Sequence, residues 1–275
     1  MKNGTLKIIN TVSFAVTVAV NALANLLPIG IGTTGEVSEK YPNLFTPAPI
    51  TFAIWGVIYA LTGLFILRQW GIFGSREQGE REAEAVGLWF AFSCAMNVGW
   101  IFAWHFDRIP LSTLLIVGLL FCLAMIGKRI SDEKRRDLSY LAVNVTFDLY
   151  FGWIIAAVIA NVTVLLVSLK WNGFGISVSV WTCLVLTVGA VIGAAASYVS
   201  RKWFSTFAVI WAYVGILIRH VGKNGYDKAY PAVIVFAVAG IVFMLLAALL
   251  KALGQPADRS PDIAVTDGGR MKRGS

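Results

Sequence analysis

The 275-residue chain has few charged residues, which make up 14% of it, whereas 57% of its residues are hydrophobic. A soluble globular domain carries about 25% charged residues. A chain this apolar has too little polar surface to cover itself in water, so the shortage of charge excludes an ordinary soluble protein. The sequence therefore predicts an integral membrane protein whose solvent is the lipid bilayer.

Cysteine and histidine are also scarce. The three cysteines, Cys94, Cys122 and Cys183, each lie in an apolar run, and their spacing fits neither a zinc site nor a disulfide framework. We interpret them as small packing residues. The two histidines, His105 and His220, fall at the ends of predicted spans, where we expect interfacial side chains rather than metal or haem ligands. No acid–base pair or nucleophile arrangement is visible, so we expect no enzyme activity and name no catalytic residue.

Long apolar runs fill most of the chain, and a run of about 20 residues is enough to cross the hydrocarbon core as a helix. Eight such runs predict spans near residues 8–28, 50–68, 86–106, 109–127, 139–167, 175–199, 203–220 and 229–251. Residues 28–49 form a long predicted outer loop, which either folds over a site as a lid or serves as a flexible linker. The segment 254–275, rich in Gly, Pro, Asp and Arg, predicts a disordered cytoplasmic tail.

The charges that are present are mostly basic, and the formal net charge is +8. The basic residues sit in short connectors between apolar runs rather than on one face, which excludes a nucleic-acid-binding surface. With the N-terminus inside, 17 of the 23 Lys and Arg residues lie on the cytoplasmic side of the membrane. This bias predicts cytoplasmic N- and C-termini and an even number of spans, and we expect the protein in the plasma (cell) membrane.

Four predicted spans each carry one stripe of amide, hydroxyl and aromatic side chains, because successive residues turn by about 100° around a helix. The stripes are Asn10, Phe14, Thr17, Asn21 and Asn25; Thr51, Trp55, Tyr59 and Thr62; Trp89, Ser93, Asn97, Trp100 and Trp104; and Tyr150, Trp153, Ala157 and Asn161. Lipid cannot satisfy an asparagine, so the stripes should face protein or a cavity. The simpler interpretation is helix–helix packing. The large rings instead favour a pocket for a flat aromatic ligand.

Asp148 lies well inside the fifth predicted span, where a carboxylate is costly. It shares a helix face with Asn144, roughly opposite to the stripe of Tyr150, Trp153 and Asn161. The face it occupies points to a contact with the last three helices rather than with the pocket. A structural hydrogen bond and a proton-coupling role both stay open.

Three motifs lie on these stripes. Pro47 is followed by Trp55-Gly-Val-Ile-Tyr59; the third span reads Ser93-Cys-Ala-Met-Asn97-Val-Gly-Trp100; and the fifth reads Leu149-Tyr150-Phe-Gly-Trp153-Ile-Ile-Ala-Ala157-Val-Ile-Ala-Asn161. They resemble the translocator protein / tryptophan-rich sensory protein family (TspO/MBR), whose patterns are W-x-x-L-Y, Q-L-x-L-N-x-x-W and P-Y-x-x-W-x-x-x-A-x-x-x-N. Ser93 replaces the glutamine of the second pattern, and Leu149 replaces the proline of the third.

The resemblance implies a five-helix membrane core that binds porphyrins and other flat hydrophobic ligands. The expected fold is an all-α, polytopic membrane helical bundle, with a TspO-like core at residues 1–168 and three further helices at residues 169–253. The expected ligand-binding residues are Trp55, Tyr59, Asn97, Trp100, Tyr150, Trp153 and Asn161. The rings would stack on a porphyrin or similar planar ligand, and the two amides would orient its polar edge. We expect no metal and no resident cofactor.

Two other functions stay open. A proton-coupled secondary transporter would use Asp148, although no internal repeat is visible. A membrane scaffold or sensor subunit would present the basic run 128–136 to a protein partner, although such a run more often sets topology beside anionic lipid. The expected partners are the lipid bilayer and a small planar hydrophobic ligand, without nucleic acid, and a homodimer is left open.

Overall fold

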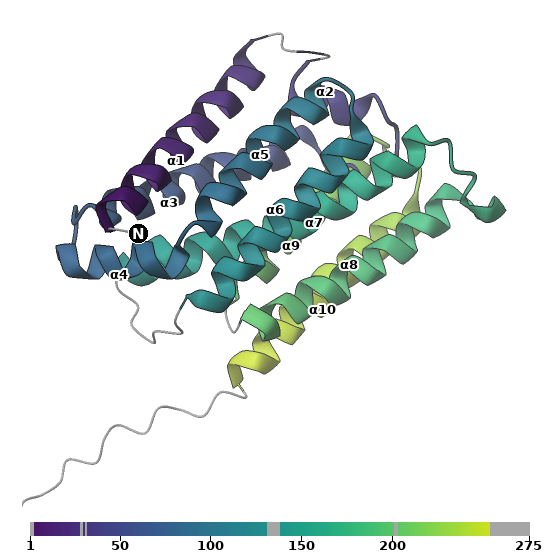
Figure 1. Cartoon of the computed structure of the whole chain (residues 1–275). Coiled ribbons are helices and arrows are strands. Elements are labelled where there is room, and N and C mark those ends of the chain that lie inside the picture. Colours follow the sequence, from purple (N-terminus) through teal and green to yellow (C-terminus); the bar gives the residue numbers. More distant parts are fainter. Residues whose placement is uncertain (1–2, 28–29, 31, 131–137, 201–202, 254–275) are drawn as a thin grey trace, which may run out of the picture.

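The computed structural model describes residues 3–27, 30, 32–130, 138–200 and 203–253, and this part of the chain is built from helices without a β-strand. Figure 1 shows the long helices side by side in one bundle. The predicted all-α, polytopic membrane fold is therefore confirmed. The predicted disordered tail, residues 254–275, and most of the basic run 128–136 lie outside the described residues.

Eight long helices make up the described bundle. They are α1 (Asn3–Leu26), α3 (Ile54–Gln69), α5 (Trp89–His105), α6 (Ile109–Arg129), α7 (Thr146–Ser168), α8 (Val178–Ser200), α9 (Phe204–Val221) and α10 (Pro231–Leu253). The shorter elements are α2 (Thr34–Glu39), the 3₁₀-helix η1 (Pro49–Ala53), α4 (Arg76–Val86), the π-helical turn η2 (Tyr140–Val145) and the 3₁₀-helix η3 (Gly173–Gly175). The long helices fall on the eight predicted spans, with their ends shifted by a few residues.

Seven helices of the described chain are long and apolar enough to cross a membrane, and α5 is the exception. It has only 17 residues and follows α4 with a bend of 58°. Gly87 ends α4 with a φ of 63°, in the left-handed region that glycine adopts without strain. The third predicted span, residues 86–106, is therefore interrupted near its start. The count reaches eight spans when α4 and α5 are taken together as one bent span.

A buried ion pair fastens the polar helix α4 to one end of the bundle. Arg68 Nη2 on α3 lies 2.7 Å from Glu82 Oε1 on α4, with the two side chains only 3% and 8% exposed. The Ser139 hydroxyl, just before η2, donates to the same carboxylate. Lys7 on α1 pairs with Glu80 at 3.0 Å. Charged groups that lipid could not satisfy are thus paired with one another where three helices end.

Two hydrophobic clusters form the core, and α9 contributes to both. The first is built mainly from α1, α3, α5, α6 and α7 and includes Ala208 and Ala212 of α9. The second is built mainly from α8 and α10 and includes Val209, Tyr213 and Ile216 of α9. Helix α9 therefore lies between the first five long helices and the pair α8 and α10, which form the edge of the bundle in Figure 1.

Asp148 on α7 holds the start of α9. Its Oδ2 accepts a hydrogen bond of 3.0 Å from the backbone N–H of Ser205, and its side chain is 5% exposed. The first N–H groups of a helix have no intrahelical acceptor, and a carboxylate there also complements the helix dipole. Of the two roles left open for Asp148, the structure shows the hydrogen bond to a late helix. Proton coupling stays a prediction.

We predict that Asp148→Ala lowers the free energy of unfolding by about 2 kcal/mol, because the Ser205 N–H loses its acceptor away from water. Asp148→Asn keeps an acceptor oxygen and should be clearly less destabilised. Thermal unfolding of detergent-purified protein, followed by circular dichroism, measures the difference. Leu114→Ala on α6 serves as the control, because Leu114 is 68% exposed. An Asp148→Ala protein as stable as this control would contradict the role of Asp148.

Gly152 allows α7 and α9 to touch, because a Cβ at this position would collide with the backbone of Ser205. We predict that Gly152→Ala lowers the free energy of unfolding by about 1–3 kcal/mol. The matched control is Gly56→Ala on α3, where an added Cβ meets nothing within 4 Å and should be neutral or stabilising by up to about 1 kcal/mol. The same unfolding assay compares the two, and equal effects would count against the close helix contact.

Candidate functional site

Aromatic rings from three helices meet around Trp55. Its ring stacks on Tyr59 of the same helix, with centroids 5.5 Å apart, and on Trp100 of α5 at 6.1 Å. Tyr150 and Trp153 of α7 present their edges to it at 5.7 and 6.2 Å. Offset stacking and edge-to-face contacts are the geometries that aromatic pairs prefer. The five aromatic residues predicted to bind a ligand therefore come together in one cluster.

The two predicted amides connect helices to one another. Asn97, which is fully buried, accepts a hydrogen bond of 2.7 Å from Asn21 Nδ2 and donates one of 3.0 Å to the Tyr150 hydroxyl. Asn161 Oδ1 accepts from Trp100 Nε1 and from the Ser112 hydroxyl, each at 3.2 Å. These bonds join α1, α5, α6 and α7. The packing interpretation of the stripes therefore describes the amides well, while the rings lie beside a cavity.

A cavity of about 50 Å³ lies next to the aromatic cluster. It is lined by Thr34, Ser38, Phe45, Pro47, Phe52, Trp55, Trp100, Trp104, Trp153, Ala156, Ala157, Ala160, Asn161, Ala212 and Ile216. Four predicted site residues thus line it, namely Trp55, Trp100, Trp153 and Asn161. The other three do not belong to the lining: Tyr59 and Tyr150 contact the lining residue Trp55, and Asn97 is hydrogen-bonded to Tyr150 behind them.

The cavity is too small in this structure for a multi-ring ligand. Pockets for drug-sized ligands measure about 300–1,000 Å³, whereas about 50 Å³ holds little more than a few water molecules. A multi-ring ligand therefore enters only if part of the lining moves. None of the lining residues carries a formal charge, so the chemistry of this cavity is that of aromatic faces, methyl groups and a few hydroxyl and amide groups.

Trp153 provides a buried indole N–H to the lining that has no hydrogen-bond partner in the described part of the chain. Its side chain is 3% exposed, and Nε1 has no hydrogen-bond partner among the described residues. The two lining indoles of α5 are paired. Trp100 Nε1 donates to Asn161 Oδ1, and Trp104 Nε1 donates to the backbone oxygen of Thr34 at 3.1 Å. Buried polar groups are nearly always hydrogen-bonded. An unpaired donor beside a cavity is therefore a point at which an acceptor atom of a ligand would be stabilised.

The segment 32–48, here called the lid segment, covers the cavity and contributes Thr34, Ser38, Phe45 and Pro47 to its lining. On one side it is held by the turn between α5 and α6. Tyr41 donates a hydrogen bond of 2.6 Å to Asp107 Oδ1, and Lys40 forms an ion pair with the same carboxylate. Of the two interpretations of the predicted outer loop, the structure shows a segment folded over a site.

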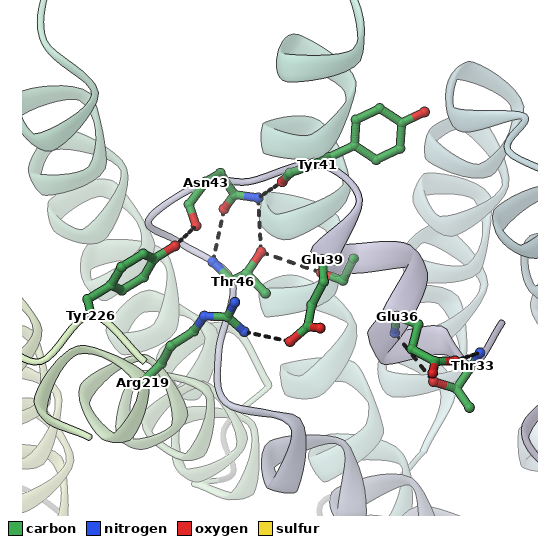
Figure 2. Close-up of polar contacts among 9 residues, drawn as sticks. Thr33, Glu36, Glu39, Tyr41, Asn43, Thr46, Arg219 and Tyr226 are labelled. Carbon is green, nitrogen blue, oxygen red and sulfur yellow. Dashed lines mark hydrogen bonds and ion pairs between the residues drawn. The ribbon is translucent and has the colours of Figure 1, made fainter. Parts of the chain in front are cut away.

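Figure 2 shows how the other side of the lid segment is fastened to α9 and the turn that follows it. Arg219 Nη1 lies 3.3 Å from Glu39 Oε1, and the Tyr226 hydroxyl donates to the backbone oxygen of Asn43 at 3.0 Å. Asn43 shapes the lid segment itself, because its side-chain oxygen accepts from the backbone N–H groups of Phe45 and Thr46. The lid is therefore tied to helices on both sides of the cavity.

Several residues that line the cavity are not among the ligand-binding residues predicted from the sequence. Trp104 belongs to the same stripe as Trp100 and lies one turn further along, so the signal was present. The lid residues could only be suspected, because a loop has no periodicity that fixes where its side chains point. Ala212 and Ile216 carried no signal at all, since an alanine and an isoleucine in an apolar helix resemble any packing residue.

The comparison with protein-family models gives one match, to the family described as TSPO-like protein, over residues 7–250. Neither the search of curated proteins nor the search of solved structures gives a match. The family match extends beyond the segment 1–168 that carries the three motifs and includes α8, α9 and nearly all of α10. The chain, a polytopic helical membrane protein with its aromatic motifs gathered at one cavity, belongs to the TSPO-like family.

Proposed function

We propose that the protein binds a flat hydrophobic ligand, such as a porphyrin or other tetrapyrrole, in the aromatic cavity. It would act as a sensor or a transporter-like binder rather than as an enzyme. The observation that carries the proposal is the convergence of Trp55, Trp100 and Trp153 on one cavity together with the unpaired Trp153 N–H. The flat shape of the ligand is argued from these rings, and its tetrapyrrole class from family membership.

The ring geometry supports stacking with a planar ligand. Trp55 and Trp100 are stacked with an interplanar angle of 29°, and Trp100 and Trp104 with one of 24°. Three indoles thus lie in a nearly parallel series beside the cavity. A further planar ring stacked on such a series gains about 0.5–1.5 kcal/mol per contact beyond the burial of its area. An aliphatic lining of the same polarity would lack this preference for flat aromatic ligands.

The placement of charge indicates how an amphiphilic ligand would be oriented. The lining carries no formal charge, whereas Glu39, Lys40, Asp107 and Arg219 lie around the lid segment. Burying an unpaired ionised group is expensive. The apolar rings of the ligand would therefore lie in the cavity and its ionised groups at the lid. We place this end of the bundle outside the cell, with both termini in the cytoplasm, on the basis of the Lys and Arg distribution.

The aromatic cavity predicts a large loss of affinity when two indoles are removed. Trp100→Ala combined with Trp153→Ala should weaken protoporphyrin binding by about tenfold to a hundredfold, because two stacking contacts and one donor are lost. Quenching of tryptophan fluorescence in detergent-purified protein measures the dissociation constant. Trp171→Ala is the matched control. Trp171 lies in the turn before α8, where it packs against Phe174 and against Trp181 of α8, and it does not line the cavity. Unchanged affinity in the double variant would argue against this pocket.

The lid segment predicts a pH dependence through Asp107. Burial by itself would raise the pKa of Asp107, but hydrogen bonds from Lys40 and Tyr41 hold this pKa below its usual value. Because the pKa is lower in the folded protein, the contact stabilises the lid above the ordinary carboxylate pKa, about 3.9, and is lost as the pH falls through the lowered value. Asp107→Asn should therefore loosen the lid at pH 7, and the difference between the variant and the unmodified protein should disappear in acid.

Hydrogen exchange of residues 32–48, corrected for the intrinsic effect of pH, measures this loosening. At pH 7 Asp107→Asn should exchange about twofold to fivefold faster than the unmodified protein, because the ion pair that it removes is partly exposed. The two proteins should converge only when the pH falls below the lowered pKa of Asp107. Asp227→Asn, an exposed aspartate in the turn after α9, is the control. Equal exchange of Asp107→Asn and this control at pH 7 would show that Asp107 does not hold the lid.

A further inference from the structure

Helix α9 forms part of the cavity although it lies outside the segment that carries the aromatic motifs. Ala212 and Ile216, one turn apart on α9, both line the cavity and are 4% and 1% exposed. The indoles Trp100 and Trp104 come from α5, which packs mainly against α1 and α6, whereas α9 packs mainly against α7, α8 and α10. The two helices therefore reach the cavity from different sides, and α9 supplies a wall without aromatic rings.

The position of this wall is fixed by close contact with η1 and the end of the lid segment. A Cβ added at Gly215 would collide with the Thr51 hydroxyl and lie 2.9 Å from Pro47 Cβ. The backbone oxygen of Gly215 accepts a hydrogen bond of 3.0 Å from the N–H of Ala48. Trp211 Nε1 donates to the backbone oxygen of Thr51 at 2.8 Å. These contacts leave α9 little freedom to move away, so its side chains determine the space on this side.

The residues of this wall are small where they face the indoles. Ala156, Ala157 and Ala160 of α7 continue the surface that begins with Ala212 of α9, and Ile216 is the bulkiest member of this group. A layer of methyl groups in the same lining as the indoles limits the thickness of any ring system that enters the cavity. Protein interiors are packed closely enough that a change of even one methylene group in such a layer is felt.

We propose that α9 determines which ligands the site accepts, with Ala212 and Ile216 as specificity-determining residues. The site selects a single flat ring system and rejects one whose substituents project out of its plane. This inference rests on the proposed function, because it assigns a role to α9 within the same cavity. It goes beyond it in placing ligand selection on a helix that carries none of the aromatic motifs.

Two probes of different thickness test the inference. Protoporphyrin is flat, whereas tetrakis(4-sulfonatophenyl)porphyrin carries four phenyl rings that stand out of the macrocycle plane. The dissociation constants of both are measured by tryptophan fluorescence quenching with the full-length protein in detergent. Unmodified protein should bind protoporphyrin at least about tenfold more tightly than the phenyl-bearing probe, since a wrongly shaped group in a packed site costs about that factor.

One substitution on α9 that adds side-chain volume and one that removes it should change how the protein binds the two porphyrins. Ala212→Leu fills the cavity and should weaken protoporphyrin binding by about tenfold, whereas Ile216→Ala enlarges it and should reduce the preference for protoporphyrin by about threefold or more. Matched controls make the same substitutions on exposed positions. They are Ile218→Ala on α9 and Ala239→Leu on α10, and both should behave as the unmodified protein.

The outcomes separate this inference from the proposed function. If Ala212→Leu weakens protoporphyrin binding or Ile216→Ala reduces the preference for protoporphyrin as stated, and the matched control does not, the inference is supported. Ile216→Ala keeps the test decisive if Ala212→Leu fails to fold. Folded variants with neither change overturn the inference alone, provided that Trp100→Ala with Trp153→Ala still weakens binding. If the unmodified protein binds neither porphyrin, the proposed function fails and this inference fails with it.

Discussion

Polar groups inside this bundle must find partners within the protein, because the hydrocarbon core offers neither water nor other hydrogen-bonding groups. This constraint explains how the helices are connected. Asn21, Asn97 and Tyr150 join α1, α5 and α7, and Trp100, Asn161 and Ser112 join α5, α7 and α6. Asp148 meets the same requirement for α9. The indole N–H of Trp153 is one of nine buried side-chain atoms without a hydrogen-bond partner among the described residues, and it lies beside the cavity, where a ligand could satisfy it.

Packing and ligand binding are not competing explanations for the side chains of one stripe. On α5, Asn97 holds helices together and lies outside the cavity lining, whereas Trp100, less than one turn later, lines the cavity and is hydrogen-bonded to Asn161. The amides fix the positions of the rings, and the rings then present their faces in a set geometry. Such preorganisation reduces the ordering that a ligand must impose when it binds.

The small size of the cavity gives the lid segment, which forms part of its lining, a role in any binding event. A space of about 50 Å³ excludes a multi-ring molecule until the lining rearranges. The contacts on either side of the lid are ion pairs and single hydrogen bonds near the surface, such as those of Asp107 and Arg219. Exposed ion pairs contribute little stability. The lid also has buried contacts, because Phe45 is 3% exposed and the backbone oxygen of Thr34 accepts a hydrogen bond from Trp104 Nε1. Opening the lid would therefore break buried contacts as well as exposed ones.

The sequence by itself determined the membrane class, the long helices and which residues share a helix face, because hydrophobic run length and helical periodicity are local properties of the chain. It also brought Trp55, Trp100, Trp153 and Asn161 onto faces that turned out to line one cavity. Only the tertiary structure decided the partner of Asp148, the fold of the lid segment, the size of the cavity and the part that Ala212 and Ile216 play in it. Each of these depends on how segments far apart in the chain approach one another, and close packing at Gly152 and Gly215 sets that approach. Neither composition nor periodicity records the distance between two helices.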